Sequence, residues 1–292
     1  MRKCKGLVLL LLFFNICFAS LSEALTNEDM GFPSKPIPPN IYNILLLQSD
    51  FPPNASFKMR TDFRSPNASG WATTPKPPNK DSYIQGLREA WVVGDTVVSP
   101  KYGYFAALAD AKTAAELSIF FEDSFLVNKF NSGSFSGVSI GEYCFSWFPS
   151  IESNRKIQAV SGLEEIAILS FSKGNYTLLV SGSNKNGSVD RNLLESLALK
   201  VGKKIDVATS LETISTSIPT LISHQGILHS LQVKLAAFVK HYQSGAYNVA
   251  LNNMTSFVNE LDAQRGKHVS EEAYQTLKAL ADTVIANTNS LL

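Results

Sequence analysis

The stretch from Gly226 to Leu280 constrains the fold most, because its apolar residues repeat with the period of amphipathic helices. The first stripe has spacings of three and four: Leu228, Leu231, Leu235, Phe238 and Tyr242. Ser244-Gly245 interrupts it, and the second stripe holds Tyr247, Leu251, Met254, Val258 and Leu261. After Gly266, Ser270 can cap a third helix with the apolar face Ala273, Leu277, Leu280 and Val284. Two such short breaks predict a small antiparallel three-helix bundle over residues 224–292.

The residues of this stretch also resemble a known module. Four features carry the resemblance: the opening Gly226–Leu235, the turn Gly245–Tyr247, the string Phe257–Leu261 and the string Gln264–Lys267. Together they are similar to the FIMAH domain, a helical module near the C-terminus of prokaryotic secreted and surface proteins. The resemblance covers less than a quarter of the chain. It implies a surface location and an accessory module, and it assigns no catalytic residue.

The N-terminus has the three parts of an export signal. The apolar run Leu7–Phe14 follows the basic residues Arg2, Lys3 and Lys5, and small residues come after it. We expect a signal peptide at 1–24 that is cleaved after Ala24. Cleavage after Ala19, lipidation at Cys17 and retention as an uncleaved anchor are the alternatives. The protein is therefore expected to be secreted or extracytoplasmic, with no transmembrane segment after signal cleavage.

Charge and cysteine content narrow the class of protein further. The chain has 26 Lys and Arg against 25 Asp and Glu, and removal of residues 1–24, with three basic residues and one acidic, leaves 23 against 24. A charge near zero without a long basic run argues against nucleic acid as a partner. Cleavage also removes Cys4 and Cys17, so Cys144 cannot form an internal disulfide and the exported fold must rely on its core.

Composition divides the rest of the chain into segments. Residues 25–82 hold most of the 13 prolines and are predicted to be extended and partly ordered, and Ile44–Leu47 could dock as a short segment. Residues 83–206 are predicted to form one α+β domain. Residues 207–223 are rich in Ser and Thr and are predicted to be a linker, in which Leu211, Ile214 and Ile218 could form one short helix.

The middle region alternates strand-like and helix-like patterns. Strands are expected at Leu87–Val98, Tyr102–Leu108, Glu142–Phe148, Glu165–Phe171 and Tyr176–Val180. Helices are expected around Ala114–Phe125 and after the cap Asp190, and Lys173-Gly174-Asn175 predicts a tight hairpin. These elements predict an α+β fold with a largely antiparallel sheet. Their order is similar to that of PsbP-like and sensor-type lipoprotein domains, in pattern rather than in motif.

One string has the form of a catalytic motif. Gly137-Val138-Ser139-Ile140-Gly141 matches the nucleophile elbow G-x-S-x-G, which needs a strand before the serine and a helix after it. Here a Ser/Gly-rich loop precedes the serine and strand-like residues follow. All four histidines lie between His224 and His268. We therefore expect a loop before a strand, no catalytic residue, no metal site and no cofactor.

An aromatic strand is the remaining candidate for a binding site. Strand alternation places Tyr143, Phe145 and Trp147 on one face of 142–148. This face either packs under the helix that carries Phe121 and Phe125 or lines a pocket for a small apolar ligand.

The sequence thus predicts an exported, non-catalytic protein. Its α+β domain would bind or sense a ligand, and its FIMAH-like bundle would serve as an accessory module. An unknown cell-surface protein or a small apolar ligand is the expected partner. A secreted serine hydrolase that uses Ser139 and a purely structural cell-surface protein are the alternatives.

Overall fold

The computed structural model describes residues 39–63, 83–106, 109, 111–115, 133–134, 138–149, 165–184 and 189–292. The predicted signal peptide and the expected helix at Phe121 and Phe125 lie outside these ranges. The chain forms two compact units. The sheet unit comprises Met1–Pro36 and Asn54–Ser196, and the helical unit comprises Ile37–Pro53 and Leu197–Leu292.

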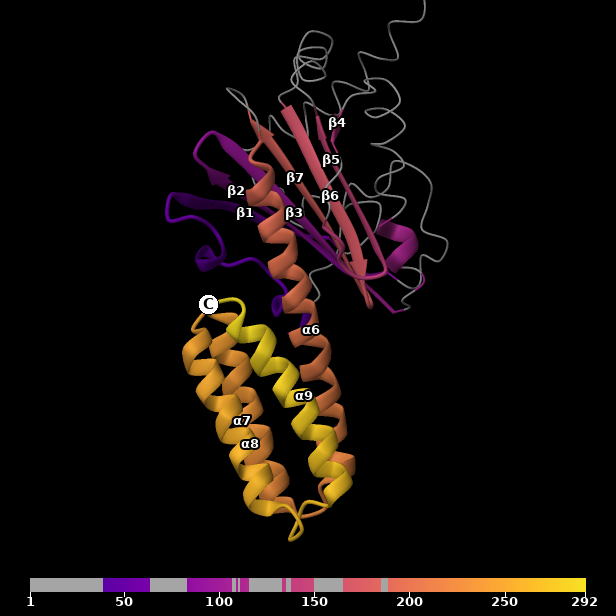
Figure 1. Cartoon of the computed structure of the whole chain (residues 1–292), viewed down its shortest axis with the longest axis vertical. Helices are drawn as coiled ribbons and strands as arrows, with labels where there is room; N and C mark the ends of the chain where they lie inside the picture. Colours follow the sequence, from indigo (N-terminus) through magenta and orange to yellow (C-terminus); the bar gives the residue numbers. More distant parts are fainter. Residues whose placement is uncertain are drawn as a thin grey trace, which may run out of the picture. The chain divides into compact units, whose positions relative to one another are not determined.

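The sheet unit is built on an antiparallel sheet, with seven strands in the described part of the chain, in the order β1-β2-β3-β7-β6-β5-β4 (Figure 1). The strands are β1 (Ala55–Phe63), β2 (Tyr83–Val93), β3 (Thr96–Phe105), β4 (Gly133–Ser134), β5 (Tyr143–Pro149), β6 (Glu165–Lys173) and β7 (Tyr176–Asn184). Every pairing between these strands is antiparallel. The predicted α+β class with a largely antiparallel sheet is confirmed.

Two tight hairpins set the register of this sheet. Gly174, with φ 54°, turns β6 into β7 as predicted, and Gly94, with φ 59°, turns β2 into β3. The expected single strand Leu87–Val98 is therefore wrong, because Gly94 supplies the left-handed backbone that such a turn needs. The expected gap between the strands Leu87–Val98 and Tyr102–Leu108 is wrong as well. Pro100 lies inside β3 opposite Val180, because proline removes only one ladder donor and its neighbours keep the register.

The first turns of helix α6 (Arg191–Leu221) cover one face of the sheet, here called the helix face. Asp190 caps α6 as predicted, because its Oδ1 accepts from the backbone N–H of Asn192 at 2.9 Å. Gly182 of β7 lies under this helix. A Cβ there would come within 2.6 Å of Val189 and 3.1 Å of Leu194, so only glycine allows so close an approach.

The helical unit contains the three predicted helices, α7 (Gln225–Gln243), α8 (Tyr247–Gln264) and α9 (Glu271–Asn289), which run side by side (Figure 1). Gly245 and Gly266, both with positive φ, end α7 and α8. The Ser270 hydroxyl caps α9 by accepting from the Ala273 N–H at 3.2 Å. Their buried faces follow the predicted stripes, although on α8 Ala250 and Phe257 are fully buried rather than Leu251 and Val258.

The predicted linker 207–223 is helical up to Leu221, which is a correction. Four residues of this part of α6 are buried in the core of the helical unit, at spacings of four, three and four: Val207, Leu211, Ile214 and Ile218. The Ser/Thr composition does not prevent helix formation, because the hydroxyls of Thr213 and Thr216 bond back to carbonyls four residues earlier. The bundle therefore has a fourth helix. Among the described helices, none has an apolar span sufficient to cross a membrane.

Part of the proline-rich segment 25–82 is ordered as expected, but it includes helical pieces as well as extended chain, which is a second correction. It contains α2 (Pro39–Tyr42), the 3-10 turn Gln48–Asp50 and strand β1. Residues 39–51, here called the strap, belong to the helical unit, whereas β1 belongs to the sheet unit. The strap bears a short apolar run between two groups of prolines, and four of its side chains are buried: Ile41, Ile44, Leu45 and Leu46. Burial of this run orders the segment despite the prolines.

Candidate ligand-binding face of the sheet

The aromatic strand β5 places its predicted site residues on the face opposite the helix face. This aromatic face carries Tyr143 and Phe145, both half-buried. Tyr143 lies opposite Ser172 of β6, and Phe145 lies opposite Ser170. The backbone of Trp147 continues the alternation, while its side chain lies outside the described atoms. The structure thus shows the alternation, and a serine of β6 lies opposite each of the two described aromatic residues.

The strand pairings extend this contact into rows across the aromatic face. From Tyr143 the first row continues through Ser172, Thr177, Gly103 and Gly86. This row consists of one aromatic ring, two hydroxyls and two glycines.

The second row carries positive charge. From Phe145 it continues through Ser170, Leu179, Lys101 and Arg88. The two cations are half-buried and lie opposite each other on β2 and β3. The row therefore brings two positive charges together on facing strands. The face thus combines aromatic, hydroxyl and cationic side chains.

Two hydroxyls of the first row are buried without a hydrogen-bond partner among the described residues. Ser172 and Thr177 are both 0 % exposed, and neither Oγ nor Oγ1 has a partner. Gly103 makes room for the Thr177 hydroxyl, because a Cβ at position 103 would lie 2.4 Å from the Thr177 Oγ1. Ser183, further along β7 on the same face, is also buried with an unpaired hydroxyl. Buried polar groups are normally satisfied, so three unpaired hydroxyls make this face the candidate binding surface.

A short helical segment covers one end of this face. Phe105, two residues after Gly103 on β3, packs against Ala111 and Ala114 of the helical residues 111–115. A helix was expected to pack over the aromatic strand β5. The described helical residues 111–115 instead contact β3. The described residues therefore leave the side of β5 without an assigned helix.

The motif around Ser139 lacks the geometry of a nucleophile elbow on its described side. Ser139 is exposed, and the chain after it bends directly into strand β5 rather than into a helix. Cys144 lies on the other face of β5, where its thiol donates to the Val138 carbonyl at 3.4 Å. Burial raises the pKa of this thiol, which lowers its reactivity.

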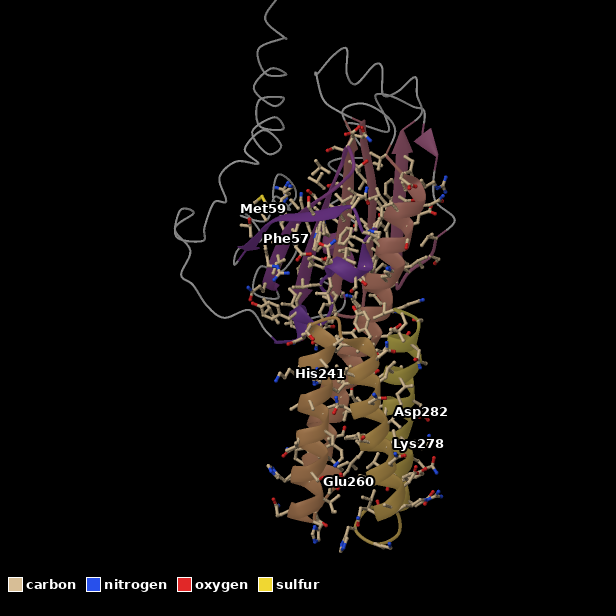
Figure 2. All side chains as sticks on the ribbon, turned by 90° about the vertical axis from the view of Figure 1, so that its left-hand side faces the viewer. Phe57, Met59, His241, Glu260, Lys278 and Asp282 are labelled. Atoms are coloured by element: carbon tan, nitrogen blue, oxygen red, sulfur yellow. The ribbon has the colours of Figure 1, made fainter. Side chains whose placement is uncertain are left out.

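A second polar cluster lies on the helix face, and the sequence analysis did not identify it. The Glu89 carboxylate is fully buried and accepts from Arg60 at 2.6 Å, from the Tyr102 hydroxyl at 3.0 Å and from the Trp91 indole at 3.4 Å. Desolvation raises its pKa, although Arg60 opposes the shift. The Phe57 ring contacts Trp91 and projects from β1, as does Met59 (Figure 2). These hydrogen bonds tie Arg60 of β1 to Glu89 of β2 and Tyr102 of β3. The sequence signal for this cluster was Glu89, an acidic residue directly before the apolar run Ala90–Val93 of β2.

The described residues contain no group of three or more His, Cys, Asp or Glu side chains placed to hold a metal ion.

In the comparison with protein families, residues 220–286 match the FIMAH domain. The match begins in the last residues of α6 and includes α7, α8 and most of α9. No curated protein matches the chain.

Proposed function

We propose that this protein is an exported, non-catalytic binding protein whose sheet unit holds an amphiphilic ligand on the aromatic face. The observation that carries the proposal is the pair of buried, unpaired hydroxyls of Ser172 and Thr177 beside the Tyr143 ring. In this proposal the helical unit, with its FIMAH match, is an accessory module for contacts with the cell surface.

The chemistry of the two rows defines the ligand class. Contact between an aromatic side chain and an apolar group releases water from both surfaces and lowers the free energy. The aromatic side chains therefore suit a hydrocarbon chain or ring. Hydroxyls in a dry environment need polar partners, which a purely apolar ligand does not supply. Arg88 and Lys101, in the row of Phe145, suit an anionic head group. The proposed ligand is therefore an amphiphile with a negatively charged head, which narrows the apolar ligand expected from the sequence.

A series of twelve-carbon amphiphiles tests the proposal on the full mature chain. Dodecanoate, dodecanol and dodecyltrimethylammonium share a tail and differ in head-group charge, and calorimetry measures their binding below their critical micelle concentrations. We expect dodecanoate to bind most tightly. Arg88→Gln and Lys101→Gln should each weaken it about tenfold, the effect of one charge-assisted hydrogen bond.

Two controls make the result specific. Lys267→Gln removes the same charge from an exposed position of the helical unit and should leave dodecanoate binding unchanged. Phe145→Ala should weaken all three ligands alike, because it removes contact with the shared tail. Equal binding of the three ligands by every variant would contradict the charged-head assignment, and the absence of any binding would contradict the proposed function.

A further inference from the structure

The strap is attached to the helical unit by polar contacts that recognise its main chain. The Lys204 ammonium donates to the Leu45 carbonyl at 2.7 Å and to the Asp50 carboxylate at 2.6 Å. Lys200 donates to the Asp50 carbonyl at 2.8 Å. Gln243 of α7 donates to the Asn43 side chain at 2.9 Å. Side chains of α6 and α7 thus bind the strap along its length, as a peptide-binding site binds an extended peptide.

The helical unit also provides an apolar and dry floor for the strap. Tyr242 and Tyr247, on either side of the α7–α8 turn, are buried, and burial raises the pKa of both phenols. Between them, Gly245 adopts a φ of 78°, and a Cβ there would lie 3.3 Å from Leu47 of the strap. The turn is therefore shaped to the strap, and we call the surface formed by these three residues with Lys200, Lys204 and Gln243 the strap site.

The chain leaves the strap through two consecutive prolines. Phe51 is extended, with φ −102° and ψ 162°, and Pro52-Pro53 follows before Asn54 enters the sheet unit. Proline restricts itself and the residue before it to extended backbone, so this hinge is stiff and does not fold back on itself. The strap is thus covalently tied to the sheet unit while its own contacts are with the helical unit. Its contacts therefore do not depend on which chain supplies it.

We propose that the strap site also accepts the strap of a second copy of this chain, so that two chains exchange straps and form a dimer. In such an exchange every contact described above is kept, and each chain supplies one strap and one site. The interface is closed and two-fold, because the two exchanged contacts are identical. A second copy is the favoured occupant because its strap carries the same apolar side chains, the same Leu45 carbonyl and the same Asp50 carboxylate that this site contacts.

A complementation experiment on full mature chains tests strap exchange. In one variant Ile44→Asp damages the strap and leaves the strap site intact. In the other Lys204→Glu damages the site, by facing Asp50 with a like charge, and leaves the strap intact. We expect each variant alone to be a monomer in light scattering after size exclusion. An equimolar mixture should contain a 1:1 complex of twice the monomer mass, because the intact strap of one fits the intact site of the other.

The controls separate exchange from non-specific association. A chain that carries both Ile44→Asp and Lys204→Glu should form no complex with the Lys204→Glu chain, because no intact site is present in that mixture. Circular dichroism at 222 nm first establishes that each variant is folded. Monomers only, in a mixture of folded variants, would overturn the proposal.

Wild-type chains supply a second measurement that does not depend on the variants folding. Isotopically heavy and light chains are incubated together at high concentration under mild urea, which opens the strap, and are then returned to buffer. Native mass spectrometry should then detect heavy–heavy, heavy–light and light–light dimers in a 1:2:1 ratio. Their absence after incubation would equally overturn strap exchange.

Discussion

Replacing Lys204 with methionine should destabilise the helical unit strongly. The Lys204 side chain is 1 % exposed and the Asp50 side chain 0 %, so the substitution leaves a buried carboxylate without its principal cation. Breaking a buried ion pair from one side costs about 3–5 kcal/mol. Lys200 lies 4.0 Å from the Asp50 Oδ1 and the Leu47 N–H donates to Oδ2 at 2.7 Å, so both moderate the loss. We therefore expect a cost near the lower limit, about 3 kcal/mol.

The double variant Lys204→Met/Asp50→Asn distinguishes a charge effect from a packing effect. Asparagine keeps the shape of the side chain and an oxygen that accepts from the Leu47 N–H, but it carries no charge. If the cost of Lys204→Met comes from the unpaired carboxylate, the double variant should recover about 2 kcal/mol of the 3. If the cost comes from packing, the double variant should be no more stable than Lys204→Met alone.

Two spectroscopic signals assign the effect to one unit. Trp71, Trp91 and Trp147, all in the sheet unit, are the three tryptophans of the chain, so indole fluorescence follows that unit. Ellipticity at 222 nm is dominated by the long helices α6 to α9. In thermal unfolding, Lys204→Met should lower the 222 nm midpoint by roughly 10–20 °C. Lys278→Met removes a lysine from the exposed pair with Asp282 on α9 and should leave the midpoint unchanged (Figure 2). A cost below about 1 kcal/mol for Lys204→Met would refute the reasoning.

Three further predictions concern other parts of the molecule. The folded-state pKa of Glu89 lies above its unfolded value of 4.5, so its contribution to stability is present below that pH and is lost as the pH rises through the raised pKa. The difference in unfolding free energy between wild type and Glu89→Gln, from urea titrations, should therefore fall as pH rises above about 4.5; a constant difference would contradict the raised pKa. Gly103→Ala places a Cβ 2.4 Å from the Thr177 hydroxyl and should cost about 1–3 kcal/mol by indole fluorescence, with recovery in Gly103→Ala/Thr177→Ala. Ile214→Ala should cost about 2–5 kcal/mol by ellipticity, whereas a flexible linker would give no change.

The helical unit shows what local pattern predicts well. The stripes of α7, α8 and α9 repeat over several turns, and the breaks at Gly245 and Gly266 coincide with positive φ, so period and turn chemistry agree. The fourth helix was predicted only in part, as one possible short helix at Leu211, Ile214 and Ile218 within a linker. Residues 207–221 have a helical apolar spacing, but their Ser/Thr content was given more weight than the spacing. Burial of four apolar side chains outweighs a helix propensity cost of a few tenths of a kcal/mol per residue.

The strap could not be predicted from local pattern. Its order depends on Lys204, which lies 154 residues after Asp50 in the sequence. No periodicity in a proline-rich segment indicates such a partner. The apolar run Ile44–Leu47 was the available signal, and it indicated docking without indicating where.

The candidate binding face was predicted only in part. Alternation along β5 placed Tyr143 and Phe145 correctly, because strand geometry is local. The hydroxyls beside them belong to β6 and β7, and their positions follow from strand register. That register is fixed by the turn at Gly174 and by pairings between residues far apart in sequence. The polar character of the face therefore became visible only when the strands were aligned.

The position of the strap has a consequence for the timing of folding. A chain made from its N-terminus exposes Ile41 and Leu46 well before α6 to α9 exist. At roughly 5–20 residues per second, the 154 residues between Asp50 and Lys204 take on the order of 10–30 s to appear. During this interval the apolar run has no intramolecular shelter, and the helical unit can reach its final form only after the whole chain has emerged. Its completion is therefore tied to the end of synthesis.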